Sequence, residues 1–251
     1  YEVSTSGKVV STGAELEADM AAIVILNSDG KGTEVFMYKD ITILGKPSVN
    51  ITINRGELTA DMFTVAEGGS LTLGTNDAAE TGKLIIDGAS DSAVAGRTVT
   101  VNSGATFTLN KNATLCNANS KQSGGALHVA GTAYLYGTIS GNKSEATGAG
   151  LYVASGATVN SSGATFSNND STGNKQNGGA VYVYKNATFT DNGSTYTGNK
   201  AKNGAAIFTG ASGANVEIEN ANFTSNQVTA NGSAIYINYG TLTIGNSTFT
   251  G

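Results

Sequence analysis

Apolar and polar residues alternate along most of the chain, in short runs of three to five residues separated by Gly, Asn, Ser and Thr. This two-residue period is typical of β-strands with one buried and one exposed face. VYV (181–183) and ATFTD (187–191) are examples. The pattern therefore predicts an all-β fold of many short strands joined by tight turns.

The alternating runs recur with a period of 24–30 residues. Five of them start with glycine: GGALHV (124–129), GAGLYV (148–153), GGAVYV (178–183), GAAIFT (204–209) and GSAIYI (232–237). A second motif follows in each period: TISGN (138–142), TFSNN (165–169), TYTGN (195–199), NFTSN (222–226) and TFTG (248–251). One more strand candidate lies between the two motifs. Three short strands per irregular period predict a right-handed parallel β-helix with three strands per coil.

Equivalent residues of successive coils should stack into columns, because paired strands lie about 4.8 Å apart. The strand period places two aliphatic columns in the core, one through Leu127 and Val181 and one through Val129 and Val183. We expect a third inward stack at Ile139, Phe166, Tyr196, Phe223 and Phe249. A turn column of Asn142, Asn169, Asn199 and Asn226 can pair its amides between coils. The leading glycines, Gly124, Gly148, Gly178, Gly204 and Gly232, predict a positive φ or a close backbone approach.

We interpret residues 1–251 as a single β-helix domain. Residues 11–26 hold a capping helix and the first strand, residues 27–123 form irregular coils, and residues 124–251 form the regular coils. Thr12 and Glu15 match a capping box, which predicts a helix over about 13–22 that covers the open edge of the first coil. The sequence stops within the motif TFTG, so we expect the native chain to continue.

Composition and charge narrow the function classes. The chain has 34 Gly, one Pro and one Cys, and only 13% of its residues are charged. A lone Cys116 excludes an intrachain disulfide framework. The net charge is −5 without a concentrated basic patch, so we expect no nucleic-acid partner. No apolar run approaches the ~20 residues of a membrane-spanning helix, so we expect no membrane-spanning segment.

The outward-facing column of the regular coils is aromatic, and it is the first candidate binding site. It contains His128, Tyr152, Tyr182, Phe208 and Tyr236. Such a ladder stabilises a sheet by cross-strand pairing, and this is the interpretation that we favour. It can also present flat apolar faces to a sugar ring or to a protein partner. No Ser or Asp is placed along the sequence to partner His128 in catalysis.

Candidate chemistry elsewhere is sparse. The acidic residues Asp77, Glu80, Asp87 and Asp91 can be considered for calcium, but their spacing matches no calcium-binding loop. The carboxylates after residue 124 do not suggest the pair that glycoside hydrolysis requires. We therefore predict no catalytic residue, no metal and no cofactor.

The motifs resemble a known group of surface proteins. The glycine-led starts and the FxxN ends (166–169 and 223–226) are similar to repeats of polymorphic outer-membrane autotransporter adhesins. The segments 63–73, 101–107 and 153–159 resemble even more closely the pectate-lyase-like adhesive domains of gut Gram-positive bacteria. The resemblance implies a non-enzymatic adhesin or stalk at the bacterial cell surface, with a host or environmental glycan or a surface protein as partner. Two alternatives stay open: a carbohydrate-active lyase or hydrolase, and a filament or surface-layer protein that self-associates end to end.

Overall fold

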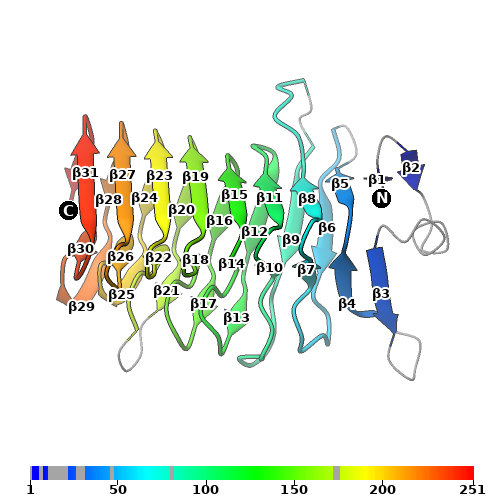
Figure 1. The fold of residues 1–251 in the computed structure, drawn as a ribbon, viewed down its shortest axis with the longest axis horizontal. Coiled ribbons are helices and arrows are strands. Elements are labelled where there is room, and N and C mark those ends of the chain that lie inside the picture. The colour runs from blue at the N-terminus through cyan, green and yellow to red at the C-terminus, as the bar shows by residue number, and fades with distance from the viewer. Residues whose placement is uncertain are drawn as a thin grey trace.

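The short alternating runs form strands that stack coil upon coil along one axis (Figure 1). The computed structural model describes residues 2–5, 8–10, 22–26, 32–45, 48–79, 82–171 and 176–251, with side chains from residue 35 onward. These residues form a parallel β-solenoid of about seven turns and contain no helix. The predicted fold class is confirmed.

Three long sheets run the length of the solenoid. Sheet 1 has the order β2 (Lys8–Val10), β1 (Glu2–Thr5), β5 (Asp40–Leu44), β8 (Ser70–Leu73), β11 (Thr106–Leu109), β15 (Thr132–Leu135), β19 (Thr158–Ser162), β23 (Thr188–Asn192), β27 (Asn215–Glu219) and β31 (Thr241–Gly245). Sheet 2 has the order β3 (Ala22–Leu26), β4 (Gly32–Met37), β7 (Phe63–Val65), β10 (Val99–Val101), β14 (Leu127–Val129), β18 (Leu151–Val153), β22 (Val181–Val183), β26 (Ile207–Thr209) and β30 (Ile235–Ile237). Sheet 3 has the order β6 (Ile51–Asn54), β9 (Leu84–Asp87), β12 (Ala113–Cys116), β16 (Thr138–Ser140), β20 (Thr165–Ser167), β24 (Thr195–Thr197), β28 (Asn222–Thr224) and β32 (Thr248–Thr250).

A fourth, shorter sheet was not expected from the sequence. Sheet 4 contains β13 (Asn119–Ser120), β17 (Lys143–Ser144), β21 (Asp170–Ser171), β25 (Lys200–Asn203) and β29 (Gln227–Asn231). The three strands per coil are confirmed for sheets 1 to 3, and sheet 4 adds a fourth from Asn119 onward. Three of its strands have only two residues, which is too short for alternation to be recognised in a sequence.

Antiparallel strands cover the first coil. Strand β3 pairs antiparallel with β4, and β1 pairs antiparallel with both β2 and β5. They occupy the N-terminal edges of sheets 1 and 2, whose main-chain groups would otherwise be open to pairing with another chain. The strand expected to follow the helix is observed as β3. The helix predicted over about 13–22 lies outside the described residues, apart from Ala22, which begins β3.

The predicted inward columns form the core. The pairing registers place Leu127, Leu151, Val181, Ile207 and Ile235 one above another. The first four of these side chains are fully buried. In sheet 3, the rings of Phe166, Tyr196, Phe223 and Phe249 stack with centroids 4.7–5.0 Å apart. This stack is inward as predicted, except that Phe249 in the last strand is exposed.

Glycine is required where each coil turns into sheet 2. Gly178 has a φ of +64°, and a Cβ at this position would lie 2.4 Å from the carbonyl oxygen of Val181. The equivalent glycines at 124, 148, 204 and 232 also have positive φ. Both predicted reasons for the glycine column, the left-handed backbone and the close approach, are therefore confirmed.

A buried ladder of asparagine amides links successive coils, as predicted. Asn142 Nδ2 donates to Asn169 Oδ1 (2.9 Å), Asn169 Nδ2 to Asn199 Oδ1 (3.0 Å), and Asn199 Nδ2 to Asn226 Oδ1 (2.9 Å). Each Oδ1 also accepts from a main-chain N–H of the preceding coil. Each Nδ2 also donates to a main-chain carbonyl there. The ladder therefore satisfies main-chain groups at a turn that lies inside the protein.

We expect Asn169→Ala to lower the free energy of unfolding by about 2 to 5 kcal/mol, because it removes the partners of the buried Asn142 N–H and Ile139 carbonyl. Urea unfolding followed by circular dichroism measures the change. Asn160→Ala, at a partly exposed position of sheet 1, is the control and should change stability by less than about 0.5 kcal/mol. Equal effects of the two substitutions would show that the ladder is not a stabilising element.

Candidate functional site

The candidate aromatic ladder lies on the outer face of sheet 2. Strands β14, β18, β22, β26 and β30 place His128, Tyr152, Tyr182, Phe208 and Tyr236 in direct register. Successive ring centroids are 5.2–5.5 Å apart, and the ring planes differ by 10–22°. The structure therefore brings all five predicted residues together in one continuous stack.

The stacking changes what the ladder can offer a ligand. Each inner ring has its two faces against its neighbours, so a flat sugar ring cannot lie on them. Phe208 is 5% exposed and the other four residues are partly buried. Tyr152, Tyr182 and Tyr236 are each partly exposed, so part of each side chain reaches the surface, although the hydroxyl of Tyr182 packs against Gly210. The arrangement fits hydrogen bonding and edge contact with a partner rather than face-on sugar stacking.

The phenols of Tyr152 and Tyr182 are neutral donors at physiological pH. Burial, with smaller contributions from Tyr182 and Tyr184, raises the pKa of Tyr152 to about 12. Burial also raises the pKa of Tyr182, and Tyr184 adds to the effect. Tyr184 lies directly beside the ladder, with its ring centroid 6.1 Å from that of Tyr152 and 6.4 Å from that of Tyr182.

Two loops from earlier coils place a charged pair at the His128 end of the ladder. Asp61 accepts hydrogen bonds from the Thr100 hydroxyl and from the main-chain N–H of Arg97, whose guanidinium lies 3.7 Å from the same carboxylate. Thr100 precedes His128 in the same column. Burial, and then the positive charge of Arg97, lower the pKa of His128 to about 4. Sequence spacing did not reveal this pair, because its members lie 31 and 67 residues before His128.

Arg55 fixes the loops that carry this charged pair. Its side chain is buried, and its guanidinium donates to main-chain carbonyls: Nε to Gly88 (3.1 Å), Nη1 to Ala60 (2.7 Å) and Leu58 (3.3 Å), and Nη2 to Arg97 (2.6 Å). Charge-assisted bonds of this kind are stronger than bonds between neutral groups. Arg55 thus joins two successive coils where their loops are irregular.

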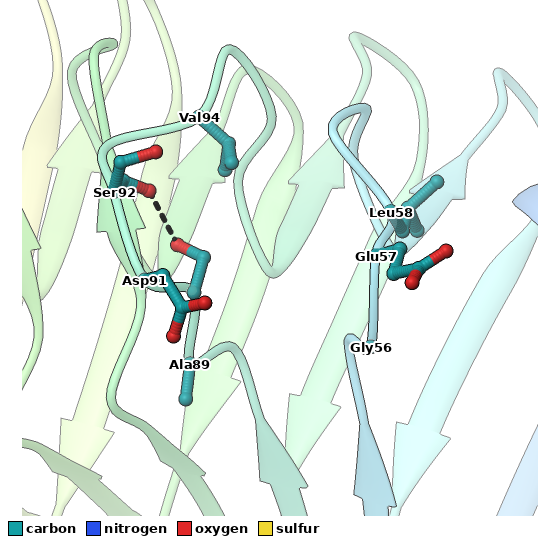
Figure 2. A pocket seen from close by; sticks show the side chains of 8 residues that line it. Gly56, Glu57, Leu58, Ala89, Asp91, Ser92 and Val94 are labelled. Carbon is teal, nitrogen blue, oxygen red and sulfur yellow. Dashed lines mark hydrogen bonds between the residues drawn. The ribbon is translucent and has the colours of Figure 1, made fainter.

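A cleft of about 350 Å³ lies between the same two loops (Figure 2). It is lined by residues 56–58, 89–92 and 94, including the carboxylates of Glu57 and Asp91. These carboxylates stand on opposite sides of the cleft and do not point toward one another (Figure 2). The cleft therefore lacks the facing carboxylate pair of a glycosidase.

The three described acidic residues that were considered for calcium, Asp77, Asp87 and Asp91, do not converge. Asp77 Oδ1 accepts from the N–H of Ala79, and Asp87 Oδ1 accepts from the N–H of Ala89, so each carboxylate closes its own turn. Asp91 lines the cleft, and Glu80 lies outside the described residues. Within the part of the chain that the structure describes, no three His, Cys, Asp or Glu side chains are grouped to hold a metal ion.

One carboxylate is buried inside the solenoid. Asp191 on β23 points into the core, where it accepts a hydrogen bond from Ser194, whose hydroxyl in turn pairs with that of Ser161 (2.9 Å). Burial raises the pKa of Asp191, an effect partly offset by the hydroxyls of Ser194, Ser161 and Tyr196. Tyr196 is fully buried, and its pKa is raised well above the usual value by burial and then by the charge of Asp191.

No protein-family model matches the chain, and neither a curated protein nor a solved structure matches it significantly. Among the described residues, no helix has the length and apolar character needed to cross a bilayer.

We expect His128 to titrate near pH 4 rather than near its ordinary 6.5. The folded protein then binds fewer protons than the unfolded chain between these values, so His128 lowers stability as the pH falls through this range. NMR titration of the imidazole measures the midpoint, and Arg97→Gln should raise it by removing a nearby positive charge. A midpoint of 6 to 7 in the wild-type protein would contradict the observed burial.

We expect Asp191 to destabilise the protein as the pH rises. Folding raises the pKa of Asp191. The folded protein therefore keeps its full stability below about pH 3.8, where Asp191 is protonated in both states, and loses part of it as the pH rises through the folded-state pKa. Asp191→Asn should therefore reduce the fall in urea midpoint between about pH 4 and 7. Thr190→Ala, at a partly exposed position of the same strand, removes no titratable group; it is the control and should leave this pH dependence unchanged.

Proposed function

We propose that the chain is a non-enzymatic module of an extracellular bacterial surface protein, and that it acts as a rigid spacer and adhesive surface. The supporting observation is the uninterrupted register of sheets 1 to 3 from β7 to β32. Each outward position recurs in every coil, so the surface carries long columns of related side chains. A periodic surface of this kind suits a partner that makes many weak contacts at once.

Rigidity is the physical basis of the spacer role. Equivalent strands of neighbouring coils are joined by main-chain hydrogen bonds in every sheet, and the Asn142–Asn226 amide ladder adds side-chain bonds between coils. Bending the solenoid would stretch these bonds on one side and compress the packed core on the other. The module would therefore hold an attached partner at a fixed distance from the cell.

The aromatic ladder with Tyr184 is the surface that we assign to a host or environmental glycan or protein. Neutral phenols donate and accept hydrogen bonds, while the ring edges contribute apolar contact. Tyrosine is enriched at protein interfaces for this combination of properties. Because the ladder is held by its own stacking, little side-chain entropy is lost when a partner binds.

We expect Tyr184→Ser to weaken partner binding roughly tenfold, since truncation of a contacting tyrosine costs on the order of 1 to 2 kcal/mol. Tyr134→Ser is a matched control, because Tyr134 is 39% exposed against 38% for Tyr184 but lies on sheet 1. Glycan arrays and binding to intact host cells provide the measurement.

Turnover assays on the same protein test the non-enzymatic part of the proposal. Release of reducing ends or unsaturated sugars from any polysaccharide, abolished by Glu57→Gln or Asp91→Asn, would overturn it in favour of an enzyme. Equal loss of binding in the Tyr184 and Tyr134 variants would show that the ladder side is not the contact surface.

A further inference from the structure

The outer face of sheet 3 differs in chemistry from the other faces of the solenoid. Its first outward column consists of Thr114, Thr138, Thr165, Thr195, Asn222 and Thr248. None of these six side chains is buried. Thr248 donates to Asn222, whereas the hydroxyls of the other four threonines have no hydrogen-bond partner within the described part of the chain.

A second column runs parallel to the first, two residues further along each strand. It consists of Cys116, Ser140, Ser167, Thr197, Thr224 and Thr250. Burial, and then the charge of Asp87, raise the pKa of the Cys116 thiol to about 11, so Cys116 is also uncharged. We call these two columns, from β12 to β32, the hydroxyl face.

The hydroxyl face carries no charged side chain from β12 to β32, although Asp87 continues its second column into β9. Two neighbouring sheets carry charges beside it. Sheet 4 carries Lys143, Asp170 and Lys200 in one outward column, and sheet 1 carries Glu217. A surface without charge gains nothing from a polyanion or a basic protein, while its desolvation cost is modest for a neutral polar partner. The absence of charged side chains on this face therefore favours an uncharged ligand.

The spacing of the face is set by the backbone. Hydroxyls of one column repeat about every 4.8 Å, the two columns lie about 6.6 Å apart, and six strands span about 24 Å. This repeat is comparable with the length of one sugar unit in an extended polysaccharide. A chain lying along the solenoid axis would meet equivalent hydroxyl groups at each coil.

Amides border the face where sheet 1 turns into sheet 3. Asn220 Nδ2 donates to Asn192 Oδ1 (2.9 Å), and Asn246 Nδ2 donates to Glu219 Oε2 (3.3 Å). Both asparagines of the first pair are exposed. The remaining amide atoms of this pair, Asn192 Nδ2 and Asn220 Oδ1, make no hydrogen bond among the described residues. One free donor and one free acceptor therefore lie beside the hydroxyl columns. Sugar hydroxyls, which both donate and accept, match such a pair.

We propose that the hydroxyl face binds an extended, uncharged polysaccharide that lies along the solenoid axis. This site is separate from the aromatic ladder, and it rests on the proposed function only in that the module stands outside the cell. Each sugar contributes one or two modest hydrogen bonds, and repetition over the coils produces the affinity.

The test compares two double variants that differ only in the face that they change. Thr165→Val with Thr195→Val removes two hydroxyls of the hydroxyl face and keeps the β-branched shape. Thr158→Val with Thr188→Val removes two partly exposed, aligned hydroxyls of sheet 1 in the same two coils. The probes are microcrystalline cellulose, chitin and a soluble mixed-linkage β-glucan, with polygalacturonate as the anionic comparison.

We expect the wild-type protein to bind at least one neutral polymer with little dependence on salt. The sheet 3 double variant should bind it roughly tenfold more weakly, and the sheet 1 double variant equally well. Thermal melting of all three proteins separates loss of binding from loss of fold.

Three results would overturn the proposal. The first is no binding to any neutral polymer, in which case Tyr184-dependent adhesion would still leave the proposed function standing. The second is equal loss in both double variants. The third is thermal hysteresis in freezing solutions, absent from the sheet 3 double variant and without polysaccharide binding, which would assign the face to an ordered water layer.

Discussion

The parallel, in-register pairing of equivalent strands is the constraint on which the rest of the structure depends. Once Leu127 lies over Leu151 and Leu151 over Val181, the strand positions of sheets 1 and 3 in these coils are also placed over their equivalents. Similar side chains then accumulate in columns, so one favourable contact is multiplied by the number of coils. A slip of one residue would exchange inward and outward faces at once, which is why the register is held so strictly.

The interior shows two ways to bury polar groups. The asparagine ladder pairs every amide with the neighbouring coil, so its members stabilise a buried turn at little cost. Asp191 and its register partner Ser161 interrupt an otherwise apolar column, which has Leu135 in the coil before them and Ile218 and Ile244 in the coils after them. Asp191 finds hydroxyl partners, but burial still disfavours its charged form. Repetition makes a polar column favourable where an isolated polar residue is not.

Outside, the same repetition gives each face its own chemistry. Sheet 2 has stacked rings, sheet 3 has hydroxyls, and sheet 4 has alternating charges. The rings of sheet 2 stack face to face on one another, so only their edges and phenol groups can contact a partner. Most outward hydroxyls of sheet 3 have no hydrogen-bond partner among the described residues, so they can bond to a ligand or to water. The irregular loops around Arg55 break this pattern and place charge at one end of the ring stack.

By itself, the sequence determined the solenoid, its core columns, the asparagine ladder, the glycine turns and the membership of the aromatic column. All of these follow from a two-residue period repeated at coil spacing, which is local information multiplied by repetition. Sheet 4, the antiparallel cover of the first coil and the separation of Asp77, Asp87 and Asp91 were decided only by the tertiary structure. So was the position of Asp61 and Arg97 beside His128, because a loop's path across the surface depends on contacts between coils rather than on any period. The tertiary structure also decided that the ring faces of Tyr152 and Tyr182 are covered, because the identities of the residues in a column do not specify how their rings are oriented.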